Sequence, residues 1–336
     1  MERQRQITSW LEQLYPGQDF TLAPASADAS FRRYFRVSFA DKTTAVVMDA
    51  PPRHEDCRPW LLVQRLFRDA GAHVPEVLAQ DLEQGFLLIS DLGHTTYLDA
   101  LKSADPDETR ALYEEACSAL IKIQSASKPG VLPEYDHATL HRELSLFPDW
   151  YVAKHLGVNL NPEQSALLAQ VFEKIMAHNL LEPRVFVHRD YHSRNLMQMA
   201  AEDNPGIIDF QDAVFGPLSY DLVSLFKDAY VAREEETSLD WLIRYWEKAR
   251  AAGLPVRADF ADFFRDYEWM GVQRHLKVLG IFARLCHRDG KEAYLKDMPL
   301  VAAYLRKACE RYREFGPLLK LLDELENRAA KAGYTF

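Results

Sequence analysis

Two short segments constrain this chain more than any other part of its sequence. Residues 188–195 read His-Arg-Asp-Tyr-His-Ser-Arg-Asn, and residues 207–212 read Ile-Ile-Asp-Phe-Gln-Asp. Strand-like apolar stretches flank the two segments, at 184–187, 196–199 and 206–208. The pattern predicts that Asp190, Asn195 and Asp209 lie in loops at the ends of short opposed strands.

These three side chains together suit phosphoryl transfer from ATP. Asp190 can orient an accepting hydroxyl and take its proton, whereas Asn195 and Asp209 offer an amide oxygen and a carboxylate to Mg²⁺. The first segment fits H-x-D-x-x-x-x-N, the catalytic-loop pattern of kinase-like phosphotransferases. Such a pattern arises often by chance, so its specificity comes from the second segment that follows at the end of an apolar strand.

The sequence after Asp209 narrows the class of substrate. From Asp212 the chain runs directly into an apolar helix expected at 218–231, which leaves no room for the peptide platform of a protein kinase. The pattern therefore favours a small-molecule acceptor. Asp221, near the start of that helix, is expected to cap it and to brace the catalytic loop.

Composition excludes several other classes. The chain has 336 residues, 48% of them apolar, and a net charge of −10, which argues against nucleic-acid or anionic-membrane partners. The first residues form an amphipathic helix and not an export signal, and no apolar run reaches the roughly 18 residues of a membrane span. Four widely spaced cysteines suit reduced thiols in a cytoplasmic protein. No obligate protein partner is inferred.

The expected fold is α+β with two kinase-like lobes. A small antiparallel lobe, residues 1–91, would bind the nucleotide, and a large, mostly helical lobe, residues 92–336, would carry catalysis and the substrate. Strands of the small lobe are expected at 20–22, 34–39, 43–48, 77–80 and 86–90, with a helix at 58–70. Helices of the large lobe are expected near 107–127, 139–156, 162–180 and 218–231, with three more after 237. Between the lobes a hinge at 91–93 would hold adenine through its backbone, beside Ser90 and Leu92.

The nucleotide lobe departs from the kinase pattern at two places. Residues 26–34 contain no glycine where a Gly-rich loop would cover the phosphates, although Ser30 and its neighbours are small enough for a tight turn. Met48 stands where a phosphate-binding lysine is expected. Arg32 and Arg33 are the candidates to replace that lysine, and strand alternation allows at most one of them to point inward. The alternative for these two arginines is that both are surface charges. Met48 and the missing glycines also leave open a non-catalytic ATP-binding regulator.

Several segments resemble one known group of enzymes. They are Ser-Phe-Arg-Arg-Tyr-Phe-Arg at 30–36, Val-Val-Met-Asp-Ala-Pro-Pro at 46–52, residues 187–197, residues 208–213 and Gln-Arg-His-Leu-Lys-Val-Leu-Gly at 273–280. With these, nearly the whole chain resembles the bacterial anomeric sugar kinases of the aminoglycoside phosphotransferase family, a group whose pattern includes Met48. The resemblance implies ATP-dependent phosphorylation of the C1 hydroxyl of N-acetylmuramate and N-acetylglucosamine in peptidoglycan sugar recycling.

Candidate substrate residues fall into two groups. The first group suits a sugar. The carboxylates of Glu143, Asp149 and Asp212 can accept hydrogen bonds from sugar hydroxyls, and the ring of Trp150 can stack on a sugar face. A basic group on one expected helix, Arg274, His275 and Lys277, suits an anion such as the lactyl carboxylate of N-acetylmuramate. Core packing of Trp150 and ordinary salt bridges of the basic group are the alternatives.

Other functions remain open from the residues alone. Choline and homoserine kinases would use the same catalytic loop. An aminoglycoside kinase would need an acid-lined pocket for a polycation, which the basic group argues against. ATP and Mg²⁺ are the expected cofactors in each of these enzymes.

Overall fold

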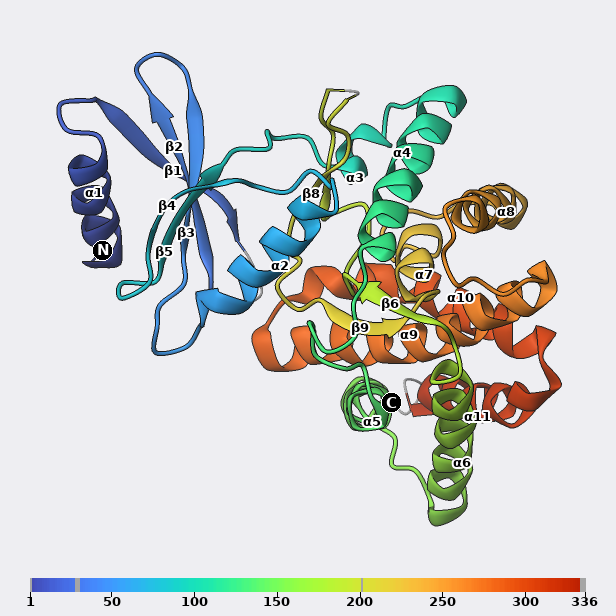
Figure 1. Ribbon diagram of the computed structural model, residues 1–336. Coiled ribbons are helices and arrows are strands. Elements are labelled where there is room, and N and C mark those ends of the chain that lie inside the picture. The colour runs from blue at the N-terminus through green and yellow to red at the C-terminus, as the bar shows by residue number, and fades with distance from the viewer. Residues whose placement is uncertain (1, 28–30, 201, 333–336) are drawn as a thin grey trace. The chain divides into compact units, whose positions relative to one another are not determined.

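A computed structural model describes residues 2–27, 31–200 and 202–332 (Figure 1). The chain forms two compact units, one of Met1–Ile123 with Arg194–Asp212 and one of Gln124–Ser193 with Ala213–Phe336. These units differ from the lobes expected at 1–91 and 92–336, since residues 92–123 and 194–212 belong to the first unit. The lobe boundaries themselves stay a prediction.

The first unit contains a five-stranded antiparallel sheet, as the sequence predicted. The order of its strands is β1-β2-β3-β5-β4. Its strands are β1 (Phe20–Ala27), β2 (Arg33–Phe39), β3 (Thr44–Asp49), β4 (Val77–Asp81) and β5 (Phe86–Ser90). In the β2–β3 pair Phe35 lies opposite Val47 and Val37 opposite Ala45. Because side chains alternate along a strand, these residues share one face of the sheet.

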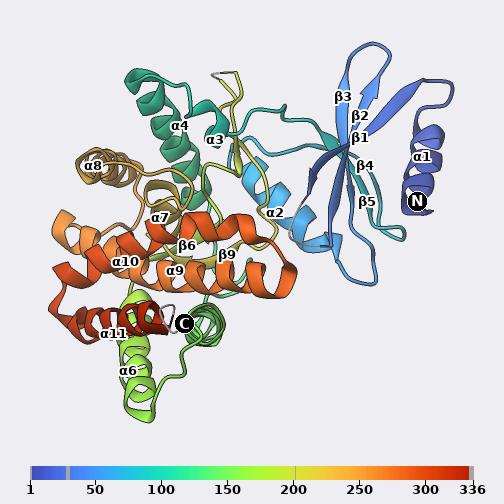
Figure 2. The same ribbon diagram turned by 180° about the vertical axis from the view of Figure 1, so that it is seen from behind.

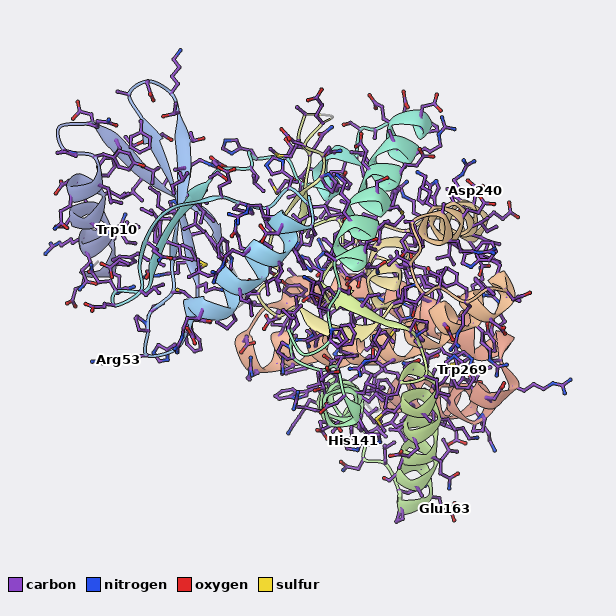
Figure 3. The ribbon with its side chains drawn as sticks, viewed as in Figure 1. Trp10, Arg53, His141, Glu163, Asp240 and Trp269 are labelled. Carbon is purple, nitrogen blue, oxygen red and sulfur yellow. The ribbon has the colours of Figure 1, made fainter. Side chains whose placement is uncertain are left out.

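Helix α1 (Glu2–Leu14) covers that face, and Figure 3 shows its Trp10 beside the sheet. Ile7, Trp10 and Leu11 pack in one apolar cluster with Val37 and Val47. The ring centroids of Trp10 and Phe86 are 5.5 Å apart. The amphipathic pattern at the N-terminus therefore serves the sheet's core.

Two other parts of the first unit frame the second polar segment. Helix α2 (Cys57–Asp69) begins at Asp56, whose side chain accepts from the backbone N–H of Arg58. Phe210 packs against this helix, with its ring centroid 5.1 Å from that of Trp60. Strands β7 (Leu196–Met197) and β8 (Gly206–Ile207) pair antiparallel as predicted. Helices α3 (Tyr97–Ala100) and α4 (Pro106–Ser125) complete the unit.

The second unit is mostly helical, as expected. Its helices are α5 (His137–Leu144), η1 (Phe147–His155), α6 (Pro162–Asn179), α7 (Tyr220–Phe226), α8 (Glu235–Ala251), α9 (Phe260–Asp289), η2 (Glu292–Asp297), α10 (Met298–Arg311), η3 (Arg313–Phe315) and α11 (Gly316–Ala332). Strands β6 (Arg184–Val187) and β9 (Val214–Pro217) pair antiparallel among them. Figure 2 shows α9 as the long helix that the other helices surround.

Helix α9 organises this unit. Its 30 residues lie between the N-cap Asp259 and the C-cap Gly290. Gly290 has a φ of 68°, the left-handed conformation that glycine adopts without strain. It packs against η1, α6, α7 and α10. Trp269, labelled in Figure 3, lies on α9 with its ring 4.5 Å from that of Phe315. The helix is therefore buried along most of its length.

Three sequence-based expectations were wrong in detail. The single helix expected at 139–156 is divided into α5 and the π-helix η1, which has Pro148 in its first turn. Residues 214–217, expected to lead directly into the next helix, form a strand because β6 offers a partner edge. After residue 237 the structure has α9, α10 and α11, while α8 begins slightly earlier, at Glu235, so four long helices replace three.

Within the described residues no helix is both long and apolar enough to cross a bilayer.

Candidate active site

The catalytic-loop segment follows β6 in the second unit, and α7 holds it in place. The backbone N–H groups of His188 and Arg189 donate to the two carboxylate oxygens of Asp221, at 2.7 and 3.0 Å. Asp221 is fully buried, and burial raises its pKa to about 7, although the two N–H donors favour the charged form. Asp221 thus braces the loop as expected. It does not cap the helix, because it lies within the first turn of α7 and the cap position is Ser219.

A second carboxylate holds the far end of the same loop. Asp228, just beyond α7, accepts from the backbone N–H of Ser193 at 2.9 Å and from that of Tyr230 at 2.9 Å. Asp228 and Ser193 are both buried. Residues 188–193 are therefore held at their start by Asp221 and at their end by Asp228, two acids near opposite ends of α7. Sequence reasoning missed Asp228, whose only signal was an acid placed just after an apolar helix.

Asp190 lies between these two anchors with its side chain 45% exposed. Partial loss of hydration favours its neutral form, but the positive charges of Lys277 and Arg274, with those of His192 and Arg189, outweigh this effect and hold the pKa of Asp190 below the usual range. The carboxylate therefore stays ionised at neutral pH. An ionised and accessible carboxylate can accept a hydrogen bond from a substrate hydroxyl and then its proton.

Glu143 of α5 has a different environment from the one expected. Its Oε1 atom contacts Arg189 and also Lys277 at 3.1 Å, whereas its Oε2 atom accepts from Tyr135 and from Gln273, the latter at 3.1 Å. Burial opposes its charge, yet Lys277 and Arg189 lower the pKa of Glu143 to about 2. Both carboxylate oxygens are engaged inside the protein, so the geometry gives Glu143 an internal role and does not support a contact with sugar.

The basic group on α9 divides into two parts. Arg274 and Lys277 point to the same side, where both donate to the hydroxyl of Tyr220, at 3.2 and 2.7 Å. Their side chains are only 8% and 6% exposed. His275 does not join them, because it stacks on Tyr304 with ring centroids 5.4 Å apart, and burial lowers its pKa well below the usual value. The structure therefore brings Arg274 and Lys277 together and places His275 apart from them.

Helix η1 carries the two remaining sugar candidates of this unit. Asp149 is exposed and Trp150 is half-buried. π-Helical turns are rare and are frequently found at functional sites. Both side chains are accessible to solvent, and their contact with a sugar stays a prediction.

In the first unit the second polar segment gathers oxygen donors. Asn195 Nδ2 lies 3.5 Å from Asp209 Oδ2, and the Gln211 amide donates to Asp209 Oδ1 at 3.0 Å and to Asp212 Oδ2 at 3.2 Å. Asp209 has a φ of 62°, which a non-glycine residue adopts at a cost. Asn195 and Asp209 therefore come together as predicted. Gln211, which sequence reasoning missed, links Asp209 to Asp212.

This set of donors fits Mg²⁺. The ion prefers oxygen ligands and is usually held by one or two carboxylates, with water and phosphate completing its shell. The Gln211 Oε1 atom is buried and has no hydrogen-bond partner in the described part of the chain. A cation or its water at this position would satisfy that atom. Within residues 2–27, 31–200 and 202–332 no group of three His, Cys, Asp or Glu side chains forms an alternative metal site.

The two arginines of the nucleotide lobe have different partners. Arg33 pairs with the buried Asp49, which also binds Arg3 of α1, so Arg33 lies on the α1 face of the sheet. Arg32 Nη1 is 3.4 Å from Glu55 Oε2, just before α2, and both side chains are largely buried. Met48 is fully buried in β3. Ser30, the other phosphate-loop candidate, lies outside the described residues.

The expected hinge is held by its own contacts. The Ser90 hydroxyl accepts from the backbone N–H of Glu76 at 2.9 Å, and Leu92 is buried. Asp91 makes a two-pronged pair with Arg36, at 2.5 and 2.8 Å. The Ser90 hydroxyl therefore serves the sheet, and the contacts of Ser90 and Leu92 with a nucleotide stay a prediction.

Comparisons with known proteins define the class. A family model described as "Phosphotransferase enzyme family" matches residues 21–260. The structure resembles that of the choline kinase LicA from Streptococcus pneumoniae, with a TM-score of 0.64 at 12% identity over 91% of this chain and 100% of that one. The chain belongs to the phosphotransferase enzyme family and has its kinase-like fold, as the sequence segments indicated.

Two relatives are far more similar than this. A protein of Neisseria meningitidis serogroup B is 50% identical over 100% of both chains, and one of Pseudomonas aeruginosa is 51% identical over 97% of this chain and 98% of that one. Both are named N-acetylmuramate/N-acetylglucosamine kinase.

Proposed function

We propose that this protein transfers the γ-phosphoryl group of ATP to the anomeric C1 hydroxyl of N-acetylmuramate and N-acetylglucosamine. One observation carries the proposal, namely the 50% identity over the full length to a protein named for that pair of substrates. The recycling of peptidoglycan sugars is the role that this activity would serve. A cytoplasmic location is proposed with it.

The chemistry assigned to Asp190 follows from its ionised, accessible carboxylate. Asp190 accepts a hydrogen bond from the C1 hydroxyl and orients its oxygen toward the γ-phosphorus. As the new C1–O–P bond forms, the bond between the γ-phosphorus and the bridging oxygen breaks and ADP leaves. The hydroxyl proton passes to Asp190. An anomeric hydroxyl is more acidic than an ordinary alcohol, so a weakly basic carboxylate is sufficient.

The metal and the sugar are assigned to separate residues. Asn195 and Asp209 would hold Mg²⁺, with the Gln211 amide keeping the Asp209 carboxylate in place. Bound Mg²⁺ supplies charge neutralisation at the phosphates. Asp149 and Trp150 of η1 remain the proposed sugar contacts, because one is exposed and the other half-buried.

A substrate panel tests the proposal. ADP release is measured with N-acetylmuramate, N-acetylglucosamine, choline, homoserine and kanamycin, and the phosphorylated position is read by phosphorus NMR. Turnover of the two amino sugars with a product phosphorylated at C1 is expected. Preferred turnover of choline, homoserine or kanamycin would identify a different kinase, and ATP binding without any turnover would indicate a regulator.

One variant links this activity to the proposed base. Asp190→Asn should bind ATP normally and lose about 10²- to 10⁴-fold in kcat, the usual contribution of a general base. Activity close to that of the wild-type enzyme would contradict the role of Asp190.

A further inference from the structure

The residue before the proposed base has an unusual backbone. Arg189 has a φ of 78°, in the left-handed region that costs energy for a residue with a Cβ atom. Such a conformation persists only where neighbouring groups hold it. Here the N–H of Arg189 donates to Asp221, and its guanidinium pairs with Glu143. The remaining backbone group of Arg189 is its carbonyl. This carbonyl is part of the peptide bond to Asp190, so its direction affects the orientation of Asp190.

Arg274 holds that carbonyl. Its Nη1 atom donates to the carbonyl oxygen of Arg189 at 2.7 Å, while its Nη2 atom lies 3.7 Å from Asp190 Oδ1. One planar guanidinium therefore reaches both the carbonyl of the strained residue and the carboxylate of the next one. A guanidinium presents donors in a fixed fork, so it restrains these two groups relative to each other.

Arg274 is itself held firmly. Its guanidinium lies over the ring of Tyr220, 5.3 Å from the centroid, and also donates to the Tyr220 hydroxyl. Lys277, one turn further along α9, donates to the same hydroxyl. Tyr220 directly precedes Asp221 in α7. Helices α7 and α9 thus both bind the backbone of Arg189. Asp221 of α7 accepts from its N–H, and Arg274 of α9 donates to its carbonyl.

We infer that Arg274 is a positioning residue for Asp190, which it orients through the carbonyl of Arg189, and that it does not read the substrate's carboxylate. The inference rests on the proposed function, in which Asp190 receives the hydroxyl proton. An 8% exposed guanidinium whose donors already face a carbonyl, a phenol and a carboxylate suits this role better than binding of a lactyl group.

The role predicts a specific split between kinetic constants. Replacing Arg274 by Lys keeps a positive charge but removes the fork that spans two acceptors. Misplacement of a reacting group by about 1 Å costs on the order of 10²-fold in rate. We expect Arg274→Lys and Arg274→Gln to lose about that factor in kcat. The KM values for ATP and for both sugars should stay within about threefold of wild type.

Two readouts separate positioning from general structural damage. Added guanidinium ion, at concentrations too low to unfold the protein, should restore part of the kcat of Arg274→Ala and none of that of Asp190→Asn. The pH profile of kcat/KM should also move. Asp190 faces Lys277 and Arg274 from α9 and Arg189 and His192 from its own loop. It also interacts with the charge of Asp221 from α7. Removal of one cation raises its pKa, so the acid limb should shift to higher pH in Arg274→Gln.

The matched control is Arg288→Ala, on the same helix but exposed and paired with its neighbour Asp289. It should leave every constant unchanged. A loss confined to KM for N-acetylmuramate in the Arg274 variants would assign Arg274 to the substrate and overturn the inference. So would an unchanged kcat in Arg274→Lys and Arg274→Gln, even if Arg274→Ala fails to fold. The proposed function stands or falls separately, on the substrate panel and on Asp190→Asn.

Discussion

Glu143 Oε1 and Lys277 Nζ lie 3.1 Å apart, with both side chains more than nine-tenths buried. A buried carboxylate of this kind is stable only beside its cations. Its removal leaves Lys277 and Arg189 as buried charges without their counter-ion, which destabilises the folded state. Since Lys277 and Arg189 lower the pKa of Glu143 to about 2, its charge contributes to the stability of the folded state.

Glu143→Gln should therefore destabilise the protein by about 3 kcal/mol at pH 7. The folded pKa lies below the ordinary value of 4.5, so the contribution is complete above about pH 4.5 and fades as the pH falls toward 2. Urea unfolding of both proteins between pH 7 and pH 3 measures this. Glu134→Gln, at an exposed pair with Arg184, is the control and should change little. A stability gap that widens on acidification would contradict the assignment.

The metal residues make a second prediction. Asp209→Ala should abolish the Mg²⁺-dependent part of ATP binding, because it removes the charged oxygen ligand, and Asn195→Ala should raise the Mg²⁺ concentration required. Calorimetric titration of ATP with and without Mg²⁺ measures both effects. The exposed Asp203 provides a control as Asp203→Ala. Identical Mg²⁺ titrations in all variants would remove the metal assignment.

The two arginines of the nucleotide lobe should behave differently. Arg33 pairs with Asp49 on the α1 face, so Arg33→Ala should lower thermal stability and leave KM for ATP unchanged. Arg32→Ala should raise KM for ATP by about tenfold, the value of a charge-assisted hydrogen bond. The exposed Arg58, as Arg58→Ala, is the control. An equal rise in KM from both changes would mean that Arg33 leaves Asp49 when ATP binds.

Close packing of α9 on η1 gives a fourth prediction. A Cβ atom at Gly280 would lie 2.4 Å from the carbonyl carbon of Leu146, a backbone atom that cannot move aside cheaply. Alanine is favoured over glycine in a helix by about 1 kcal/mol. The clash should exceed this gain, so Gly280→Ala should lose about 1–3 kcal/mol in urea unfolding. Gly316→Ala, where a Cβ meets nothing within 4 Å, should be neutral or stabilising. Equal effects at both positions would contradict the packing argument.

Several features follow from the sequence alone. The order and spacing of Asp190, Asn195 and Asp209 identify the phosphotransferase chemistry, because few other functions need a base, an amide and a carboxylate in this pattern. Short apolar runs bounded by turn residues place the five strands of the sheet. Local periodicity and motif spacing are properties of neighbouring residues, so a single sequence carries them.

Tertiary structure decided which charged residues are available. Glu143 and Lys277 are 134 positions apart in the chain, and nothing local shows that they neutralise each other. His275 and Arg274 are adjacent in sequence but face Tyr304 and Tyr220. The π-helix η1 likewise depends on a distant contact. The residue before it, Leu146, lies close to α9 because Gly280 has no side chain there. Pairing, burial and close approach depend on which distant elements meet, and that is settled only when the whole chain packs.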